Sequence, residues 1–332
     1  MKRYLPDTFM TLIIVMVVAA SIFPCHGEGA RLFNGITKFM ICLLFFLHGC
    51  KLSPQAVKEG MLHWRLHLTV LACTFAVLPA LGLLLKPLLG PLVTPELYLG
   101  VLFVCVLPST VQSSIAFTSI ARGNVPAAVC AASASNLLGI FLTPMLVGAI
   151  VVADRAGGGA SDAAANIAVQ LFLPFVAGQL ARPWLGPRLA RAKKLVKGVD
   201  QGSILLVVYT AFSEAVNGGL WQQLPLRSLL GLMVISGVLL ALIIAISTYG
   251  SRMLGFSKED EITIVFCGSK KSMASGIPMA KLLFSGHALG AVVLPLMLFH
   301  QLQLMVCTVL AQRYAARAPD ETIAPCSPAR KT

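Results

Sequence analysis

Residues 107–124 read LPSTVQSSIAFTSIARGN, and residues 262–280 read ITIVFCGSKKSMASGIPMA. Each stretch places glycine, proline or polar side chains in the middle of a long apolar run. In a bilayer, backbone that is not regular helix persists only where protein or a water-filled cavity surrounds it. The two stretches therefore predict a pair of interrupted membrane spans that meet inside the protein.

The composition of the chain supports a membrane setting for both stretches. The 332 residues are 57% apolar and 12% charged, and the mean hydropathy is +0.83. These values exclude a soluble globule and a disordered chain. The 28 glycines and 19 prolines have no period, which excludes a collagen-like repeat. The nine cysteines are scattered without C-x-x-C spacing, so we expect small core residues and not a disulfide framework.

Ten apolar runs are long enough, or nearly so, to cross a bilayer about 30 Å thick as helices. They are roughly residues 8–25, 32–49, 66–85, 97–120, 125–152, 166–181, 201–218, 228–249, 262–284 and 288–311. The first run ends with FPCH at residues 23–26 and not with a cleavage site of small residues. We therefore interpret it as a membrane helix and not as a signal peptide.

The net charge of +13 indicates orientation in the membrane and not a nucleic-acid partner. With the N-terminus inside, 18 of the 26 lysines and arginines lie on cytoplasmic segments, five lie on outer segments and three lie within spans. The five are Arg31, Lys86, Arg155, Arg227 and Lys281, and the three are Lys38, Lys270 and Lys271. Because positive charge collects in loops that stay inside, we expect both termini in the cytoplasm. The composition of the loops suggests a bacterial inner membrane.

Two halves of five spans each are predicted. Residues 153–165 (ADRAGGGASDAAA) form a soft linker between a first half at 1–152 and a second at 166–312, and residues 313–332 form a disordered cytoplasmic tail. Because five is an odd number, two halves of one fold must enter the membrane from opposite sides. Such inverted repeats are typical of secondary transporters.

The stretches FSEAVNGG, DEITIVFCGSKKSMASGIPMA and VLPLMLFHQLQLMVC carry a family resemblance. Over about residues 5–314 the chain resembles the sodium/bile-acid symporter superfamily, in the branch that contains the seventh member of solute carrier family ten and its bacterial relatives. The resemblance implies an all-α membrane protein with ten transmembrane helices, an inverted five-helix repeat and crossing discontinuous helices four and nine. It also implies a panel domain of helices one, two, six and seven and a core domain of helices three to five and eight to ten.

The resemblance further implies a substrate and ion site at the crossing. Symporters of the family place two sodium ions there, using Ser and Asn after a Pro-Gly-Gly in helix four and Glu followed by Gln-Asn in helix nine. Here Pro108 keeps the proline, and Ser113 and Ser114 fall at the Ser-Asn positions. Ser269 falls near the Gln position and Lys270 replaces the Asn.

The glutamate position of helix nine holds Val265 or its neighbour, so no carboxylate is offered to a cation there. Sodium prefers oxygen ligands with negative charge. We therefore question sodium coupling, and retain Ser113, Ser114 and Ser269 as a possible sodium set. The alternatives to sodium are coupling to a proton and no coupling, and no other cofactor is expected.

Lys270 and Lys271 are the most informative candidates. A charge at bilayer depth costs about 2.5–3.5 kcal/mol on insertion scales and is usually paired or functional. Adjacent helix residues point about 100° apart, so at most one of the two faces the crossing squarely. We favour one ammonium in the place of a sodium ion, as counter-charge for an anionic substrate or as proton carrier. The alternatives are an ion pair with Glu214 and the capping of half-helix carbonyls.

Several other polar residues complete the predicted site. The full set of binding candidates is Pro108, Thr110, Gln112, Ser113, Ser114, Gly268, Ser269, Lys270, Lys271, Ser272 and Glu214. Glu214 is either a proton or cation site or a solvated residue near a helix end. His48 and His300 are proton relays or packing residues. The amides of Gln112, Asn136, Gln301 and Gln303 suit helix bridging as well as ligand binding.

The sequence thus favours a secondary active transporter of a small organic, anionic solute, with the solute and membrane lipid as its partners. The alternative is a non-transporting regulator on the same fold, for example one acting in ion homeostasis. An intramembrane Ser/Lys hydrolase is disfavoured because neighbouring side chains on one helix diverge and no G-x-S-x-G motif is present. The sequence does not determine the oligomeric state.

Overall fold

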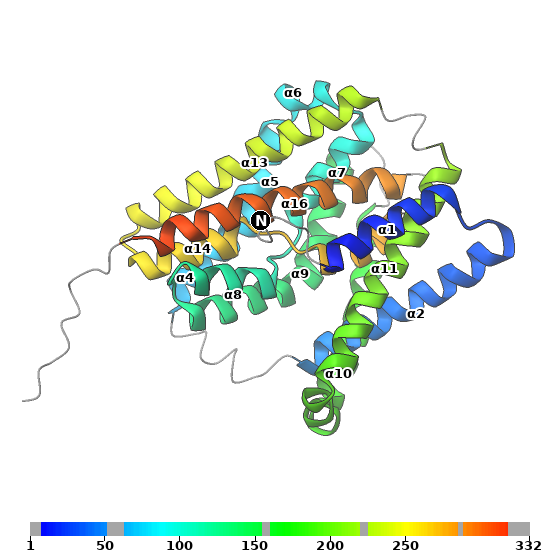
Figure 1. Ribbon diagram of the computed structural model, residues 1–332, viewed down its shortest axis with the longest axis horizontal. Helices are drawn as coiled ribbons and strands as arrows, with labels where there is room; N and C mark the ends of the chain where they lie inside the picture. Colours follow the sequence, from blue (N-terminus) through cyan, green and yellow to red (C-terminus); the bar gives the residue numbers. More distant parts are fainter. Residues whose placement is uncertain (1–7, 52–62, 155–159, 220–224, 285–287, 318–332) are drawn as a thin grey trace, which may run out of the picture.

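The computed structural model describes residues 8–51, 63–154, 160–219, 225–284 and 288–317, and all regular structure in these ranges is helical (Figure 1). The elements of the first half are α1 (Thr8–Ile22), α2 (Gly27–Lys51), α4 (Trp64–Ala72), the π-helix η2 (Cys73–Val77), α5 (Leu78–Leu84), α6 (Lys86–Leu89), the 3-10 helix η3 (Gly90–Leu92), α7 (Pro95–Val106), α8 (Val111–Ile120) and α9 (Val125–Asp154). Those of the second half are α10 (Ala160–Arg191), α11 (Lys193–Asn217), α13 (Leu226–Met253), α14 (Lys258–Ser269), α15 (Met273–Leu283) and α16 (Ala288–Ala315).

Six helical segments in the described ranges are long and apolar enough to cross a membrane, which confirms an all-helical, multi-pass architecture. They are Gly27–Cys50, Trp64–Leu84, Val125–Ala149, Lys194–Asn217, Leu226–Met253 and Leu289–Ala315. A seventh candidate is the pair α7 and α8, which are bent by 63° at a short break. Each of the ten predicted runs overlaps one or more helices, while the count of ten spans and the inverted repeat stay predictions.

The helices form two groups. In one group, α10 packs along α2, and α11 packs on both α1 and α2 (Figure 1). The other group holds α4, α5, α7 to α9 and α13 to α16. The groups meet where α11 packs against α15 and α16 and where α10 packs against α9. The four helices of the first group are those that the resemblance assigns to a panel domain.

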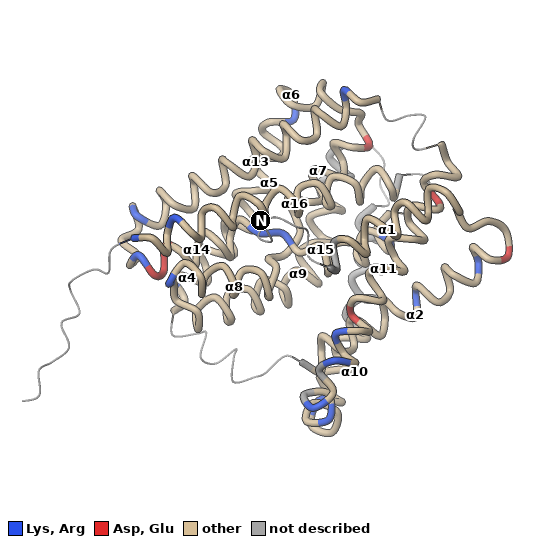
Figure 2. The backbone as a smooth tube through the Cα atoms, in the orientation of Figure 1, with Lys and Arg blue, Asp and Glu red and all other residues tan. Residues whose placement is uncertain are grey.

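Two regions are more helical than the sequence suggested. α9 reaches Asp154 and α10 begins at Ala160, so helices extend into the predicted 153–165 linker, of which residues 155–159 lie outside the described ranges. The basic stretch 182–197, which lies between the predicted runs 166–181 and 201–218 and was expected to be a loop, is helical: α10 ends at Arg191 and α11 starts two residues later. Figure 2 shows basic residues gathered at this end of α10. Most of the predicted tail, residues 318–332, also lies outside the described ranges.

A buried carboxylate ties together three helices at the end of the core group. Glu261 directly precedes the span predicted from residue 262, and its side chain is only 3% exposed. It accepts hydrogen bonds from Arg252 Nε on α13 at 2.9 Å, from Lys258 Nζ on α14 and from Tyr314 Oη on α16 at 3.0 Å. The carboxylate thus joins α13, α14 and α16.

The Glu261 network predicts a pH-dependent stability. Burial alone would raise the pKa of Glu261, but hydrogen bonds from Arg252, Lys258 and Tyr314 hold it below its ordinary value of 4.5. Because the folded pKa is the lower one, the ionised group stabilises the fold above the unfolded pKa, and this contribution disappears as pH falls through the folded pKa. We expect Glu261→Gln to lower the melting temperature at pH 7, and its difference from wild type to shrink below about pH 4.5. A difference that is constant from pH 7 to pH 3.5 would contradict this.

Candidate functional site at the helix crossing

Two of the ten predicted membrane runs, 97–120 and 262–284, are each interrupted by a short segment without helical structure. Residues 107–110 separate α7 from α8, and residues 270–272 separate α14 from α15. Pro108 in the first break has no N–H and restricts the preceding residue to extended backbone, which ends α7. In the second break, the Oγ of Ser272 accepts a hydrogen bond from the N–H of Ser275 at 3.2 Å and so caps the start of α15.

The two breaks contact one another directly. The N–H of Ser272 donates to the carbonyl of Pro108 at 2.9 Å. Thr110 Oγ1 donates to the carbonyl of Lys271 at 2.8 Å. Each break therefore satisfies backbone groups that the other leaves open, as buried polar groups require. The predicted meeting of two interrupted segments is present in the structure.

The ammonium of Lys271 lies against three backbone carbonyls. Its Nζ donates to Thr74 O at 2.8 Å and to Cys105 O and Leu107 O, both at 2.7 Å. The residue is fully buried. An ammonium has three hydrogens, so these bonds use its whole donor capacity. Capping of half-helix carbonyls, one of the alternatives drawn from the sequence, is thus confirmed for Lys271.

The sequence explains why the carbonyl of Thr74 is available. In the π-turn η2, the N–H of Leu78 bonds to Cys73 O, five residues back, and so passes over Thr74. The next residue, Pro79, has no N–H to offer. A single π-turn followed by proline therefore leaves one carbonyl without a partner along its own helix. Lys271 supplies the missing donor.

The other two carbonyls lie at the C-terminal end of α7. The last carbonyls of a helix have no partner within it, and the helix dipole places partial negative charge there. Cys105 O and Leu107 O receive the ammonium, while Val106 O accepts a hydrogen bond from Thr143 Oγ1 at 2.9 Å. The positive charge therefore lies at the negative end of a half-helix.

The side chain of Gln303 on α16 clamps the second break. Its Oε1 accepts from Lys271 N at 3.0 Å, and its Nε2 donates to Lys271 O at 3.0 Å. A backbone N–H can only donate, which fixes the orientation of the amide. The second Nε2 hydrogen then points to His300 Nδ1, 2.9 Å away. Nδ1 must accept, so the imidazole of His300 is neutral in this arrangement.

Lys270 is placed quite differently from its neighbour. It is fully buried, and its Nζ lies 3.8 Å from the centre of the Phe117 ring on α8. Among the described residues the ammonium has no hydrogen-bond partner. Neither Lys270 nor Lys271 forms an ion pair with a described carboxylate within 4.0 Å. The expectation that the two side chains diverge is confirmed, and neither reaches the surface.

Glycines allow the close packing of the crossing. A Cβ on Gly268 of α14 would lie 2.9 Å from the Cβ of Cys73, next to the π-turn. A Cβ on Gly139 of α9 would lie 2.6 Å from the Cβ of Pro108. Real Cβ atoms do not approach so closely, so both positions require glycine. Gly268 was a candidate from sequence, whereas Gly139 was not.

Comparison with known proteins supports a transporter. The model of the SBF-like CPA transporter family matches residues 7–316. The chain is 61% identical to an uncharacterized protein of Pseudomonas aeruginosa over 97% of both chains. It is 54% identical to the "Putative symporter YfeH" of Escherichia coli, over 93% of this chain and 92% of that one. It is 30% identical to the mouse sodium/bile acid cotransporter 7 over 93% of both chains.

The chain belongs to the SBF-like CPA transporter family. This family consists of transporters and not of enzymes, as expected from the sequence. Together with the apolar helices, membership makes the chain an integral, multi-pass membrane protein. The resemblance seen in the sequence is confirmed.

In this SBF-like transporter, Glu214 does not pair with either lysine of the break. Its Oε1 accepts hydrogen bonds from Lys281 Nζ at 2.7 Å and from Asn34 Nδ2 at 2.9 Å. The predicted alternative of an ion pair with Lys270 or Lys271 is therefore wrong. Lys281 lies on α15, beyond the break, and the sequence placed it on an outer segment. The pair joins α11 to α15, one helix from each group.

We expect Glu214 and Lys281 to be energetically coupled. The side chain of Lys281 is only 9% exposed and that of Glu214 is 30% exposed, so removing one partner leaves a largely desolvated charge. Lys281→Met and Glu214→Gln should each lower the melting temperature, and the double variant should lose much less than the sum of both losses. The matched control is the exposed pair of Arg31 and Glu28, whose side chains are 82% and 90% exposed and whose removal should have little effect. If the losses of melting temperature in the two single variants add up in the double variant, the contact between Glu214 and Lys281 contributes nothing to stability.

The hydroxyl candidates have separate partners. Ser114 Oγ donates to Phe266 O at 3.2 Å, and Ser269 Oγ donates to Val265 O of its own helix at 2.6 Å. Ser113 Oγ is buried and has no hydrogen-bond partner among the described residues. No described contact links these three serines to one another, so a sodium site formed by them remains a prediction. Gln112 is exposed on α8.

Two of the amides considered from sequence bridge helices. Gln303 joins α16 to the second break, as above, and Asn136 on α9 accepts a hydrogen bond from Ser275 Oγ on α15 at 2.8 Å. Sequence reasoning missed Thr74, although the proline five residues later was a usable signal. It also missed Ser135 on α9, whose Oγ accepts from Ser109 N at 3.0 Å; no sequence signal identifies this contact.

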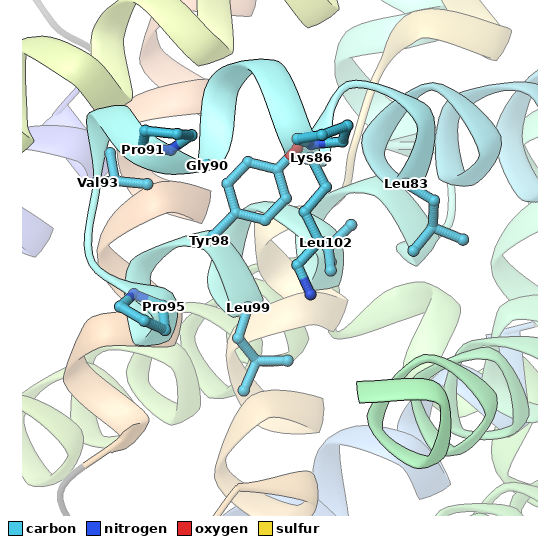
Figure 3. A pocket seen from close by; sticks show the side chains of 10 residues that line it. Leu83, Lys86, Gly90, Pro91, Val93, Pro95, Tyr98, Leu99 and Leu102 are labelled. Carbon is cyan, nitrogen blue, oxygen red and sulfur yellow. The ribbon is translucent and has the colours of Figure 1, made fainter. Parts of the chain in front are cut away.

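One cavity lies away from the crossing. It has a volume of about 530 Å³ and lies where the chain turns from α5 through α6 and η3 into α7 (Figure 3). Its lining is mostly apolar, with Leu83, Val93, Leu99 and Leu102, and includes Lys86 and the ring of Tyr98. The hydroxyl of Tyr98 is already bonded to Gly82 O at 2.8 Å. The cavity shares none of the residues of the two breaks.

Proposed function

We propose that this chain is a secondary active transporter that carries a small organic anion across the bacterial inner membrane by alternating access. In this proposal the chain has ten spans in two inverted five-helix halves, with both termini in the cytoplasm. The first group of helices acts as the panel and the second as the core. The contact between two interrupted segments and the symporter name of a close relative support the proposal.

The position of Lys271 is the observation that carries the proposal. Three backbone carbonyl oxygens of the core group converge on one point. The Nζ atom of Lys271 occupies this point, 2.7–2.8 Å from each oxygen. Carbonyls at the end of an interrupted helix are suitable ligands for a coupling ion. With the ammonium there, the core carries positive charge without sodium. A fixed positive charge favours an anionic solute over a neutral or cationic one.

This arrangement makes sodium unnecessary for charge balance at the site. Coupling is then to a proton or is absent, and the transported anion is the group that neutralises the positive site during part of the cycle. The panel and core groups separate at the contact of Glu214 with Lys281 during this cycle. The substrate lies between the groups, near the crossing.

The experiment is a thermal-shift screen of the purified protein against small organic anions, with and without sodium and at several pH values, followed by flux in reconstituted vesicles. We expect anions to raise the melting temperature equally in sodium and in potassium. A shift that requires sodium would overturn the proposed role of Lys271. If hits from the screen bind but no solute crosses the vesicle membrane, the non-transporting regulator becomes the better description.

A further inference from the structure

We infer that Lys270 is the residue that binds the anionic group of the solute, whereas Lys271 is a permanent substitute for a bound cation. This division of roles rests on the proposed function, because it presumes that an organic anion enters the crossing. It assigns different tasks to two adjacent residues of the same type. Their surroundings, and not their sequence, distinguish them.

The hydrogen-bonding capacity of the two ammonium groups differs completely. Lys271 has three donors and three carbonyl acceptors, so a solute could bind it only by displacing a backbone carbonyl. Lys270 has the same three donors and, among the described residues, no acceptor. A buried ammonium without hydrogen bonds is strongly unfavourable. An anion that binds Lys270 would supply the missing hydrogen-bond acceptors and so lower this energetic cost. At Lys271 the acceptors are already present, so an anion would gain nothing there.

The groups around Lys270 provide no competing negative charge. The ammonium lies over the ring of Phe117, which supplies only a weak cation–π attraction. The groups that interact with it electrostatically include the thiols of Cys267 and Cys307 and the imidazole of His300. Thiols are weak acceptors, and His300 is neutral in the hydrogen-bond network of Gln303. The positive charge is therefore uncompensated by the described residues.

A second unpartnered group lies on the same face of α8. Ser113 and Phe117 are four residues apart and so lie on one side of the helix. Ser113 Oγ is buried without a hydrogen-bond partner among the described residues. The N-terminus of α8 also lacks a side-chain cap, because the Thr110 hydroxyl bonds to Lys271 O instead. A hydroxyl donor near an uncapped helix start favours an anion over a cation.

This combination specifies a chemical class of solute. One ammonium with one hydroxyl matches one carboxylate or sulfonate group. The residues around the ammonium, Phe117, Phe266 and Ala121, are apolar, so the body of the solute should be apolar and small. We therefore assign small aromatic or aliphatic monoanions, and not dianions or phosphates, to this site.

The assignment predicts opposite stability changes at neighbouring positions. Lys270→Met removes an uncompensated buried charge and keeps the volume of the side chain, so the melting temperature of the detergent-solubilised protein should rise by a few degrees. Lys271→Met leaves three carbonyls without a donor and should lower it. A fall for Lys270→Met, or failure of this variant to fold, would overturn the assignment. This result needs no solute, so it does not depend on whether transport is found.

Binding is tested with benzoate, with neutral benzamide as a probe of the same shape. We expect benzoate, but not benzamide, to raise the melting temperature of the wild type. The shift should disappear in Lys270→Met and return in Lys270→Arg. In Ser113→Ala, a several-fold higher benzoate concentration should be needed for the same shift. A full benzoate shift in Lys270→Met, or none in the wild type, would overturn the inferred site. Loss of flux in a protein that still shows the Lys270-dependent shift would instead contradict the proposed function alone.

Discussion

Lys271→Met should cause a large loss of stability. The change removes the shared donor of Thr74 O, Cys105 O and Leu107 O, which lie in η2 and at the end of α7. Each buried acceptor left without a partner costs about 1–3 kcal/mol. Loss of the buried charge itself offsets part of this total. We expect a net loss of about 3 kcal/mol or more, and very little monodisperse protein after extraction.

The measurement is the melting temperature and the yield of monodisperse protein in detergent. Lys194→Met is the control, because Lys194 is an exposed residue of α11 and its loss should change little. Gln303→Leu should lie between the two, since it removes the acceptor of Lys271 N but leaves Thr110 bonded to Lys271 O. Wild-type stability in Lys271→Met would mean that the three carbonyls find other partners. It would also contradict the proposal that Lys271 substitutes for a bound cation.

Gly178→Val and Gly49→Val should also prevent folding, for a reason of packing and not of charge. A Cβ on Gly178 of α10 would lie 2.0 Å from the carbonyl oxygen of Phe46, and one on Gly49 of α2 would lie 2.1 Å from that of Phe175. Both obstacles are backbone atoms, which cannot rotate away as a side chain would. Overpacking that side chains absorb costs about 1–3 kcal/mol, so we expect a larger loss here. The two helices would have to separate.

A matched control is present on the same helix. Gly35 also belongs to α2, but a Cβ there meets nothing within 4 Å. Gly35→Ala should be neutral or slightly stabilising, because alanine favours the helix. Expression level and melting temperature of the three variants distinguish a local clash from a general intolerance of α2. Folding of Gly178→Val with the wild-type melting temperature would show that α2 and α10 do not pack as described.

Much of the architecture followed from patterns that act locally. The apolar runs predicted helices of membrane-spanning length because lipid leaves the backbone no partner outside its own helix. Proline, glycine and serine within two of those runs predicted the interruptions at residues 107–110 and 270–272. The linker at 153–165 and the basic stretch 182–197 are more helical than their composition predicts. The reason is that alanine and the basic residues are also good helix formers. Composition alone did not distinguish a flexible connection from a helical one.

The candidate site was only partly accessible from sequence. The pattern identified Lys270 and Lys271 as costly residues at bilayer depth and showed that they must point in different directions. It did not show which acceptors each one meets, because Thr74, Cys105 and Gln303 are distant along the chain. Likewise, Glu214 was the conspicuous carboxylate, and only the packing of α11 on α15 assigned it to Lys281.

The sequence by itself determined that this chain is helical, that it lies in a membrane and that two of its spans are interrupted. These properties depend on side-chain polarity and on the missing N–H of proline, both of which act within a few residues. Only the tertiary structure decided that one lysine is fully hydrogen-bonded and its neighbour is not. That difference depends on which backbone carbonyls from other helices reach each ammonium, and such long-range geometry is fixed only when the helices pack.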